Sequence, residues 1–166
     1  MLKIALVVLL LLTVTGVAQS PPLPATFIPN SDIQSFIDAL PRNAVSDKPI
    51  RSVDVGGYHV AVFGVFRPKS VAQEANRHDT KVTEIYYILD GNATLVTGGA
   101  VPDPHPLSPG STTFQSSRIE GGTSRRVSRG DVVIIPGRTP HWFSEQDGDL
   151  RYLIFRPDPE GRIALK

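Results

Sequence analysis

From Arg51 onward, apolar and polar residues alternate with a period close to two. On an extended chain this period places the apolar side chains on one face, so each such run is a candidate β-strand. The pair Asp90-Gly91, which lies between two runs, is typical of a hairpin turn. The expected strands are 58–66, 84–89, 93–97, 112–119, 124–128, 131–135, 141–145 and 150–155. Many short strands separated by turn residues indicate an all-β sandwich or barrel.

One stretch before these runs has the period of a helix instead. Its apolar residues recur at helical spacing and fall on one face: Ile33, Phe36, Ile37 and Leu40. Ser31 and Gln34 have the spacing of a capping box at its start, and Pro41 ends it. We expect the apolar stripe to cover the outside or the mouth of the barrel.

The first residues have the pattern of a secretory signal peptide. Lys3 precedes an apolar run from Ile4 to Val14, and the small residues Gly16 and Ala18 follow it. The run is shorter than the roughly 20 apolar residues that span a bilayer. We therefore expect cleavage after Ala18 and a secreted or periplasmic protein, with an uncleaved N-terminal anchor as the alternative.

The expected organisation follows from these patterns. The signal peptide covers 1–18, an N-terminal arm and helix cover 19–50, the barrel covers 51–157 and a C-terminal tail covers 158–166. The chain has no cysteine, so no disulfide supports the barrel. Without Lys3 the basic residues fall from 17 to 16 and equal the 16 acidic ones. This balance gives no electrostatic reason to expect nucleic-acid binding.

Two segments carry candidate metal ligands. His78 and Glu84 are six residues apart, and an even spacing on one extended strand sends both side chains to the same face. Further along, Gly130 opens an apolar strand that ends in a turn with Pro136, and His141 begins the next strand. An imidazole and a carboxylate among apolar neighbours favour a site inside the protein.

These two segments resemble the two signature motifs of the cupin superfamily. The first motif is matched by His78, Glu84 and Gly91, and the second by Gly130, Pro136 and His141. The resemblance spans about 51–157 and implies a double-stranded β-helix, or jelly-roll, barrel with the motif residues inside. It also implies that His78, Glu84 and His141 hold one divalent metal ion. Imidazole and carboxylate ligands suit Fe, Mn, Zn or Ni.

The match to the cupin motifs is incomplete. The departures are Ala72, Thr80, Arg138 and Glu145, which stand where the motifs have Gly, His, Gly and Asn. Thr80 replaces the family's fourth metal ligand. Its hydroxyl is a poor ligand, although it can hydrogen-bond a metal-bound water. The resemblance therefore implies a three-residue ligand set of two histidines and one carboxylate.

Each candidate residue has a structural alternative. His141 can pack against Trp142, and a buried Glu84 needs either a metal or an arginine partner. Tyr86 shares the register of Glu84, so it is either a proton donor in the pocket or a core residue. His59 is expected to be structural or on the surface rather than catalytic. His105 is expected to be exposed, unless its proline-rich loop folds back over the barrel mouth.

Three functions are consistent with these patterns. The first is a metal-dependent cupin enzyme, for example a dioxygenase, isomerase or lyase, that acts on a small organic molecule. The second is a non-catalytic cupin that binds a small ligand without metal. The third is a structural or storage-type protein of dimerising barrels, in which the arm from Ser20 to Asn30 exchanges between subunits. A possible homodimer is compatible with each of them.

Overall fold

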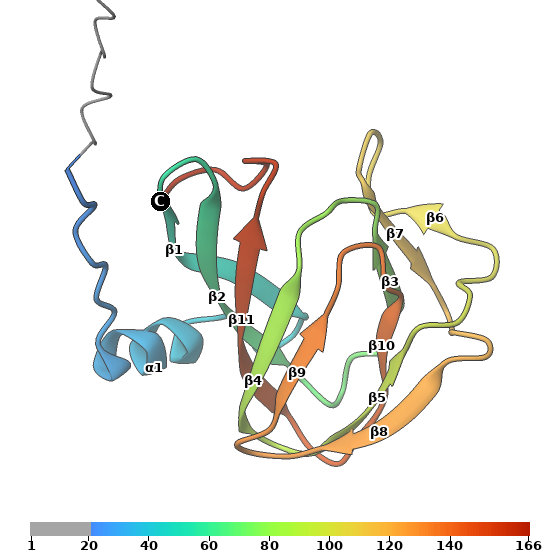
Figure 1. Ribbon diagram of the computed structural model, residues 1–166. Helices are drawn as coiled ribbons and strands as arrows, with labels where there is room; N and C mark the ends of the chain where they lie inside the picture. The colour runs from blue at the N-terminus through green and yellow to red at the C-terminus, as the bar shows by residue number, and fades with distance from the viewer. Residues whose placement is uncertain (1–20) are drawn as a thin grey trace, which may run out of the picture.

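A computed structural model describes residues 21–166 (Figure 1). The expected signal peptide, 1–18, lies outside the described residues. A short helix, α1 (Asn30–Asp38), is followed by strands only. The strands are β1 (Ser46–Asp54), β2 (His59–Arg67), β3 (Ala75–His78), β4 (Glu84–Asp90), β5 (Ala93–Thr97), β6 (His105–Pro106), β7 (Thr113–Ser116), β8 (Thr123–Val127), β9 (Val132–Ile135), β10 (His141–Gln146) and β11 (Leu150–Asp158). The expected all-β class with one N-terminal helix is confirmed.

The strands form two antiparallel sheets that face each other (Figure 1). The first sheet has five strands in the order β1-β2-β11-β4-β9, and the second has six in the order β6-β7-β3-β10-β5-β8. Successive strands often lie in opposite sheets, so the chain winds back and forth across the barrel. This winding is the double-stranded β-helix that the sequence motifs imply.

Apolar side chains from both sheets fill one half of the barrel. In β4, Tyr86 and Ile88 are buried while Tyr87 is exposed, as the period of two predicts. The buried apolar cluster consists of Ala61, Phe63, Val65, Tyr86, Ile88, Ala93, Leu95, Val127, Ile135, Phe143, Leu150, Tyr152 and Ile154. The other half of the barrel carries the polar side chains described below.

Helix α1 packs on the outer face of the five-stranded sheet. Ile37 and Leu40 are buried there against Phe66 and Leu153, which confirms the predicted apolar stripe and its place outside the barrel. The predicted capping box is wrong. The N-cap residue is Pro29, Ser31 lies within the helix, and no side chain caps it. The backbone carbonyl of Pro29 accepts the first turn's N–H groups instead.

The predicted hairpin at Asp90-Gly91 is also wrong. Strand β4 pairs with β11 and β9, whereas β5 pairs with β10 and β8, so the turn connects two sheets. Gly91 has φ +89°, and a Cβ there would lie 2.4 Å from the carbonyl oxygen of Asp149. The glycine is therefore required by a tight corner of the barrel.

The ends of the sheet differ from the sequence expectation. Strand β1 begins at Ser46, within the segment assigned to the arm and helix, and β11 continues to Asp158. The described arm before α1 is exposed and extended (Figure 1). No helix among residues 21–166 combines the length and apolar character needed to cross a membrane.

Candidate metal centre

His78, Glu84 and His141 come from three strands that meet inside the barrel. His78 ends β3 in the six-stranded sheet, and Glu84 begins β4 in the five-stranded sheet. The two side chains therefore do not lie on one face of a single strand. The prediction that they come together is right, but the even spacing on one strand is not the cause. The chain crosses between the sheets at residues 79–83, so the side chains approach each other across the interior. His141 begins β10, next to β3.

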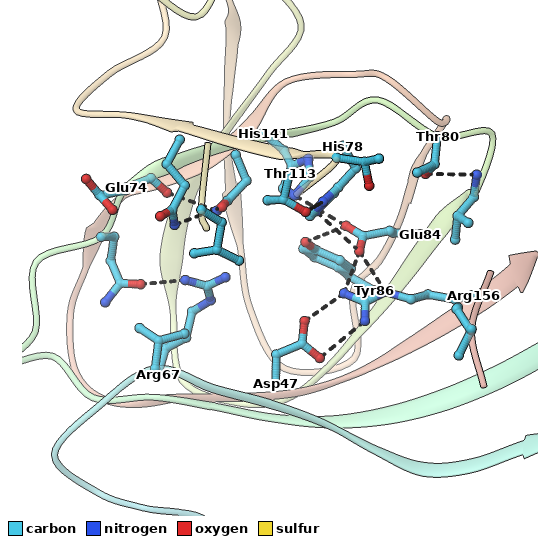
Figure 2. Close-up of a pocket in the computed structure, with 18 of the residues that line it drawn as sticks. Asp47, Arg67, Glu74, His78, Thr80, Glu84, Tyr86, Thr113, His141 and Arg156 are labelled. Atoms are coloured by element: carbon cyan, nitrogen blue, oxygen red, sulfur yellow. Dashed lines mark hydrogen bonds and ion pairs between the residues drawn. The ribbon is translucent and has the colours of Figure 1, made fainter. Parts of the chain in front are cut away.

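The three side chains point toward one another (Figure 2). One donor atom from each lies within 4.8 Å of the others. His141 Nε2 is 3.3 Å from one carboxylate oxygen of Glu84, and His78 Nε2 is 3.7 Å from the other. Glu84 and His141 are almost completely buried, whereas His78 is partly open to the cavity. The arrangement brings together the donor set implied by the motif resemblance.

The outer ring nitrogen of each histidine is held by another residue. Nδ1 of His141 lies 3.0 Å from the backbone carbonyl oxygen of Thr139, and Nδ1 of His78 lies 2.8 Å from the hydroxyl of Thr113. A carbonyl oxygen only accepts, so Nδ1 of His141 must carry a hydrogen. In the neutral ring, Nε2 then aims a lone pair at the Glu84 carboxylate. Two atoms that both present lone pairs, here Nε2 and the carboxylate oxygen, need a proton or a metal ion between them. This geometry is suitable for a metal ligand.

Arg156 occupies the other side of Glu84. Its Nε donates to Glu84 Oε1 at 2.7 Å, and its Nη2 donates to Asp47 at 2.6 Å. Burial alone raises the pKa of Glu84, but Arg156 and then the two histidines outweigh it and lower the pKa to about 2. The arginine partner that sequence reasoning offered as an alternative to a metal is thus present. The second carboxylate oxygen of Glu84, Oε2, faces Tyr86 and His141 instead.

The environment keeps His78 neutral. Burial lowers the pKa of His78, and the attraction of Glu84 opposes this, while repulsion by the protonated form of His141 and by Arg156 lowers the pKa further. The pKa falls from 6.5 to about 4. The ring is therefore neutral at pH 7, which is the form that binds a metal.

Tyr86 lies directly behind the carboxylate. Its hydroxyl donates to Glu84 Oε2 at 3.0 Å, and its ring meets His141 edge to face. Burial, with the charge of Glu84 added, raises the pKa of the Tyr86 phenol well above 10. Tyr86 is thus both a core residue and a protonated hydrogen-bond donor at the site.

Thr80 lines the same cavity but is engaged in a turn. Its hydroxyl accepts from the backbone N–H of Val82 at 3.4 Å, and its backbone packs under Gly137. A Cβ at Gly137 would lie 2.5 Å from the carbonyl oxygen of Thr80. The turn of the second motif therefore sits directly on the first motif.

The remaining histidines are not part of the centre. His59 binds the carbonyl oxygen of Ile163 through Nδ1 at 2.8 Å, in agreement with a structural role. His105 is exposed and lies 3.8 Å from Glu74. Its loop does reach the cavity, which it lines with Leu107 rather than with His105.

The centre opens into a cavity of about 780 Å³. This volume is within the usual range for small-molecule sites. The cavity is also lined by Arg67 and by residues of the loop after β2, among them Gln73 and Glu74. A small organic molecule therefore has room beside the three donor atoms.

Comparisons with known proteins concern the fold. No protein-family model and no curated protein matches the sequence. The structure is similar to an uncharacterised conserved protein with a double-stranded β-helix domain from Klebsiella pneumoniae, with a TM-score of 0.53 and 9% identity. That match covers 86% of this chain and 97% of the other. This chain has the double-stranded β-helix fold. The DMSP lyase DddQ from Ruegeria pomeroyi is also similar, with a TM-score of 0.50 and 16% identity over 87% of this chain and 79% of that one.

Two arginines inside the barrel were missed by sequence reasoning. Arg156 follows Tyr152 and Ile154 at a spacing of two, so its inward direction could be read from the pattern of β11. Arg67 likewise follows Phe63 and Val65 in β2. Which acidic or polar groups face them depends on strands far away in the sequence, and no local signal gives those partners.

Proposed function

We propose that this protein is an exported, metal-dependent cupin enzyme that acts on a small organic molecule. One divalent ion, Fe, Mn, Zn or Ni, would be held by His78, Glu84 and His141. The observation that carries the proposal is the position of His141, whose Nε2 lies 3.3 Å from a carboxylate oxygen inside a cavity while its Nδ1 is bound to a backbone carbonyl. Convergence of a second imidazole on the same carboxylate supports it.

The surrounding residues have distinct tasks in this proposal. When bound, a divalent ion supplies Lewis-acid or redox chemistry next to the substrate. Arg156 orients Glu84 and keeps it ionised. Tyr86 holds a proton at its hydroxyl, where it can donate to Glu84 or to a substrate oxygen. Thr113 and the Thr139 carbonyl orient the two histidines.

Elemental analysis tests the metal. The protein is purified without chelators or a histidine tag, beside His141→Ala and a control, His105→Ala, which changes an exposed histidine outside the centre. We expect close to one divalent ion per chain in the parent and control, and loss of most of it in His141→Ala. Parent protein that is metal-free and takes up no Fe, Mn, Zn, Ni or Cu on titration would contradict the proposal.

Export is proposed from the sequence of residues 1–18 alone. We expect protein recovered from the periplasm or medium to begin at Gln19, as mass spectrometry of the intact chain would reveal. Full-length chain in the membrane fraction would favour the uncleaved anchor instead.

A metal-free ligand-binding cupin is the second candidate, and one contact favours it. Arg156 already neutralises Glu84, so the carboxylate has a partner without a metal. Thr80, which stands in the place of the fourth metal ligand, also favours the metal-free alternative. Under this alternative His141 carries a proton on Nε2 and donates to Glu84.

A further inference from the structure

Arg67 is a cation inside the barrel without a carboxylate partner. Four arginines in the described chain are partly buried. Three of them form ion pairs: Arg77 with Asp79, Arg151 with Asp38, and Arg156 with Asp47 and Glu84. No carboxylate of residues 21–166 lies within 4.0 Å of the Arg67 guanidinium. A buried charge without a counter-charge is costly, and proteins keep such groups where a ligand or substrate completes them.

Neutral groups hold the Arg67 side chain in place. Its Nε donates to the hydroxyl of Tyr152 at 2.7 Å, and its Nη1 donates to the side-chain oxygen of Gln73 at 2.6 Å. The guanidinium also lies 5.4 Å from the Phe143 ring. These contacts fix its orientation without neutralising it. Its Nη2 has no hydrogen-bond partner among residues 21–166 and is not an enclosed atom, so it is available within the cavity.

The other charged side chains of the cavity each have an ion-pair partner. Asp47 and Glu84 share Arg156, and Arg162 pairs with Glu160. Glu74 lies near the exposed His105. Among the described lining residues, Arg67 is therefore the charged side chain that has no ion-pair partner within 4.0 Å, while the Asp47–Arg156–Glu84 group carries one negative charge in excess.

The Arg67 site is connected to the candidate metal centre through the protein. Figure 2 shows Arg67 and Asp47 in the lower part of the view, with Tyr86 and the His78–Glu84–His141 group above them, and all of these residues line the same cavity. The backbone carbonyl of Gln73 accepts from the indole of Trp142 at 2.9 Å, which fixes the Gln73 loop beside His141. A ligand anchored at Arg67 therefore has its other end in the cavity that contains the three metal-ligand candidates.

We propose that Arg67 binds the carboxylate of the substrate, so that the substrate is a small organic acid. The proposal deepens the function proposed above and rests on it for the reacting end of the molecule. A carboxylate fits better than a phosphate, because Arg67 has one terminal nitrogen without a protein partner, and a phosphate carries more charge and more oxygen atoms than that nitrogen can bind. Arg67 is a substrate-binding residue here, and Gln73 positions it.

Ligand titrations test this inference on the purified protein, both as isolated and after metal removal. The probes are benzoate, its uncharged analogue benzamide, and inorganic phosphate, with binding followed by calorimetry or nuclear magnetic resonance. We expect benzoate to bind more tightly than the other two. Arg67→Gln should weaken benzoate binding roughly tenfold or more, since a charge-assisted hydrogen bond is lost. Arg67→Lys, which keeps the charge, should retain part of the affinity for benzoate.

Arg77→Gln is the matched control, because it removes an equal charge from a partly buried arginine that does not line the cavity. Benzoate binding unchanged in Arg67→Gln, or benzamide binding equal to that of benzoate, would overturn the inference. So would binding that persists in Arg67→Gln but disappears when metal is removed. Arg67-dependent binding by metal-free protein would uphold it even if elemental analysis contradicted the metal-dependent function.

Discussion

At the scale of single residues, the site is governed by how charges are balanced inside the barrel. Arg156 joins two carboxylates, Asp47 and Glu84, that would otherwise be unpaired in a buried environment. The same arginine lowers the pKa of Glu84 and helps to lower that of His78. Replacement of this one cation therefore affects both stability and metal affinity.

We expect Arg156→Met to destabilise metal-free protein by about 3 kcal/mol, because it leaves the buried Glu84 and the partly buried Asp47 without a counter-charge. The cost should be smaller in a Glu84→Gln background, and added Zn²⁺ should partly restore stability at Glu84. Urea unfolding measures each free energy. Arg151→Met, which breaks a partly exposed pair with Asp38, should cost less than about 1 kcal/mol. Equal stability of Arg156→Met and parent would contradict this account.

The neutral state of His78 predicts a pH dependence of stability in metal-free protein. The pKa of His78 falls from 6.5 to about 4 on folding, so between these values the unfolded chain binds the proton and the folded chain does not. The free energy of unfolding should therefore fall by roughly 1–3 kcal/mol as the pH drops from 6.5 to 4. Denaturant titrations should show this slope reduced in His78→Gln and kept in His105→Gln. A parent slope identical to that of His78→Gln would contradict the assignment.

At the scale of elements, the turn between β9 and β10 joins the two cupin motifs. Gly137 packs on the carbonyl of Thr80, and the next N–H, that of Arg138, donates to the carbonyl of His78 at 3.2 Å. Arg138 has φ +67°, a left-handed conformation, at the position where the cupin motif has glycine. A residue with a Cβ is strained in this conformation.

We expect Arg138→Gly to stabilise the protein by about 1 kcal/mol, because it relieves the strain at positive φ. The greater freedom of glycine in the unfolded chain offsets part of the gain. Arg138 is exposed, so few contacts are lost. Thermal unfolding measures the change, with Arg129→Gly, at an exposed position of negative φ, as the control. A lower stability of Arg138→Gly would mean that the side chain contributes a contact that outweighs the strain.

At the scale of the whole molecule, the barrel separates a packed half from a polar half that holds the cavity. The described arm before α1 contributes to neither. Leu23 and Phe27 are exposed, although both are apolar. Apolar residues on an unpacked arm are typical of a segment that contacts another molecule. A second copy of this chain is the partner expected from the sequence.

Deletion of residues 21–27 tests the role of the arm. We expect the free energy of unfolding of the barrel to change by less than about 0.5 kcal/mol, since these residues are exposed. Light scattering after size-exclusion chromatography should find a dimer for the mature chain and a monomer after the deletion. A dimer that survives the deletion would remove the arm from the interface.

The sequence by itself was sufficient for the periodic features. Alternation with a period of two predicted every strand except β1, β3 and β6, and the apolar stripe of α1 predicted which face it buries, because both depend on neighbours a few residues apart. Motif spacing also brought together His78, Glu84 and His141. It did so by resemblance, since His78 and Glu84 lie in opposite sheets and not on one strand as their spacing suggested.

Only the tertiary structure decided what depends on pairing between distant strands. The Asp90-Gly91 turn has the composition of a hairpin, yet the barrel winds its two strands into different sheets. Arg156 meets Asp47 across 109 residues of sequence, and Arg67 meets Tyr152 across 85. The sequence pattern around a charged residue does not predict which distant residue it pairs with. Whether a buried arginine is neutralised, like Arg156, or left for a ligand, like Arg67, is therefore determined by the fold.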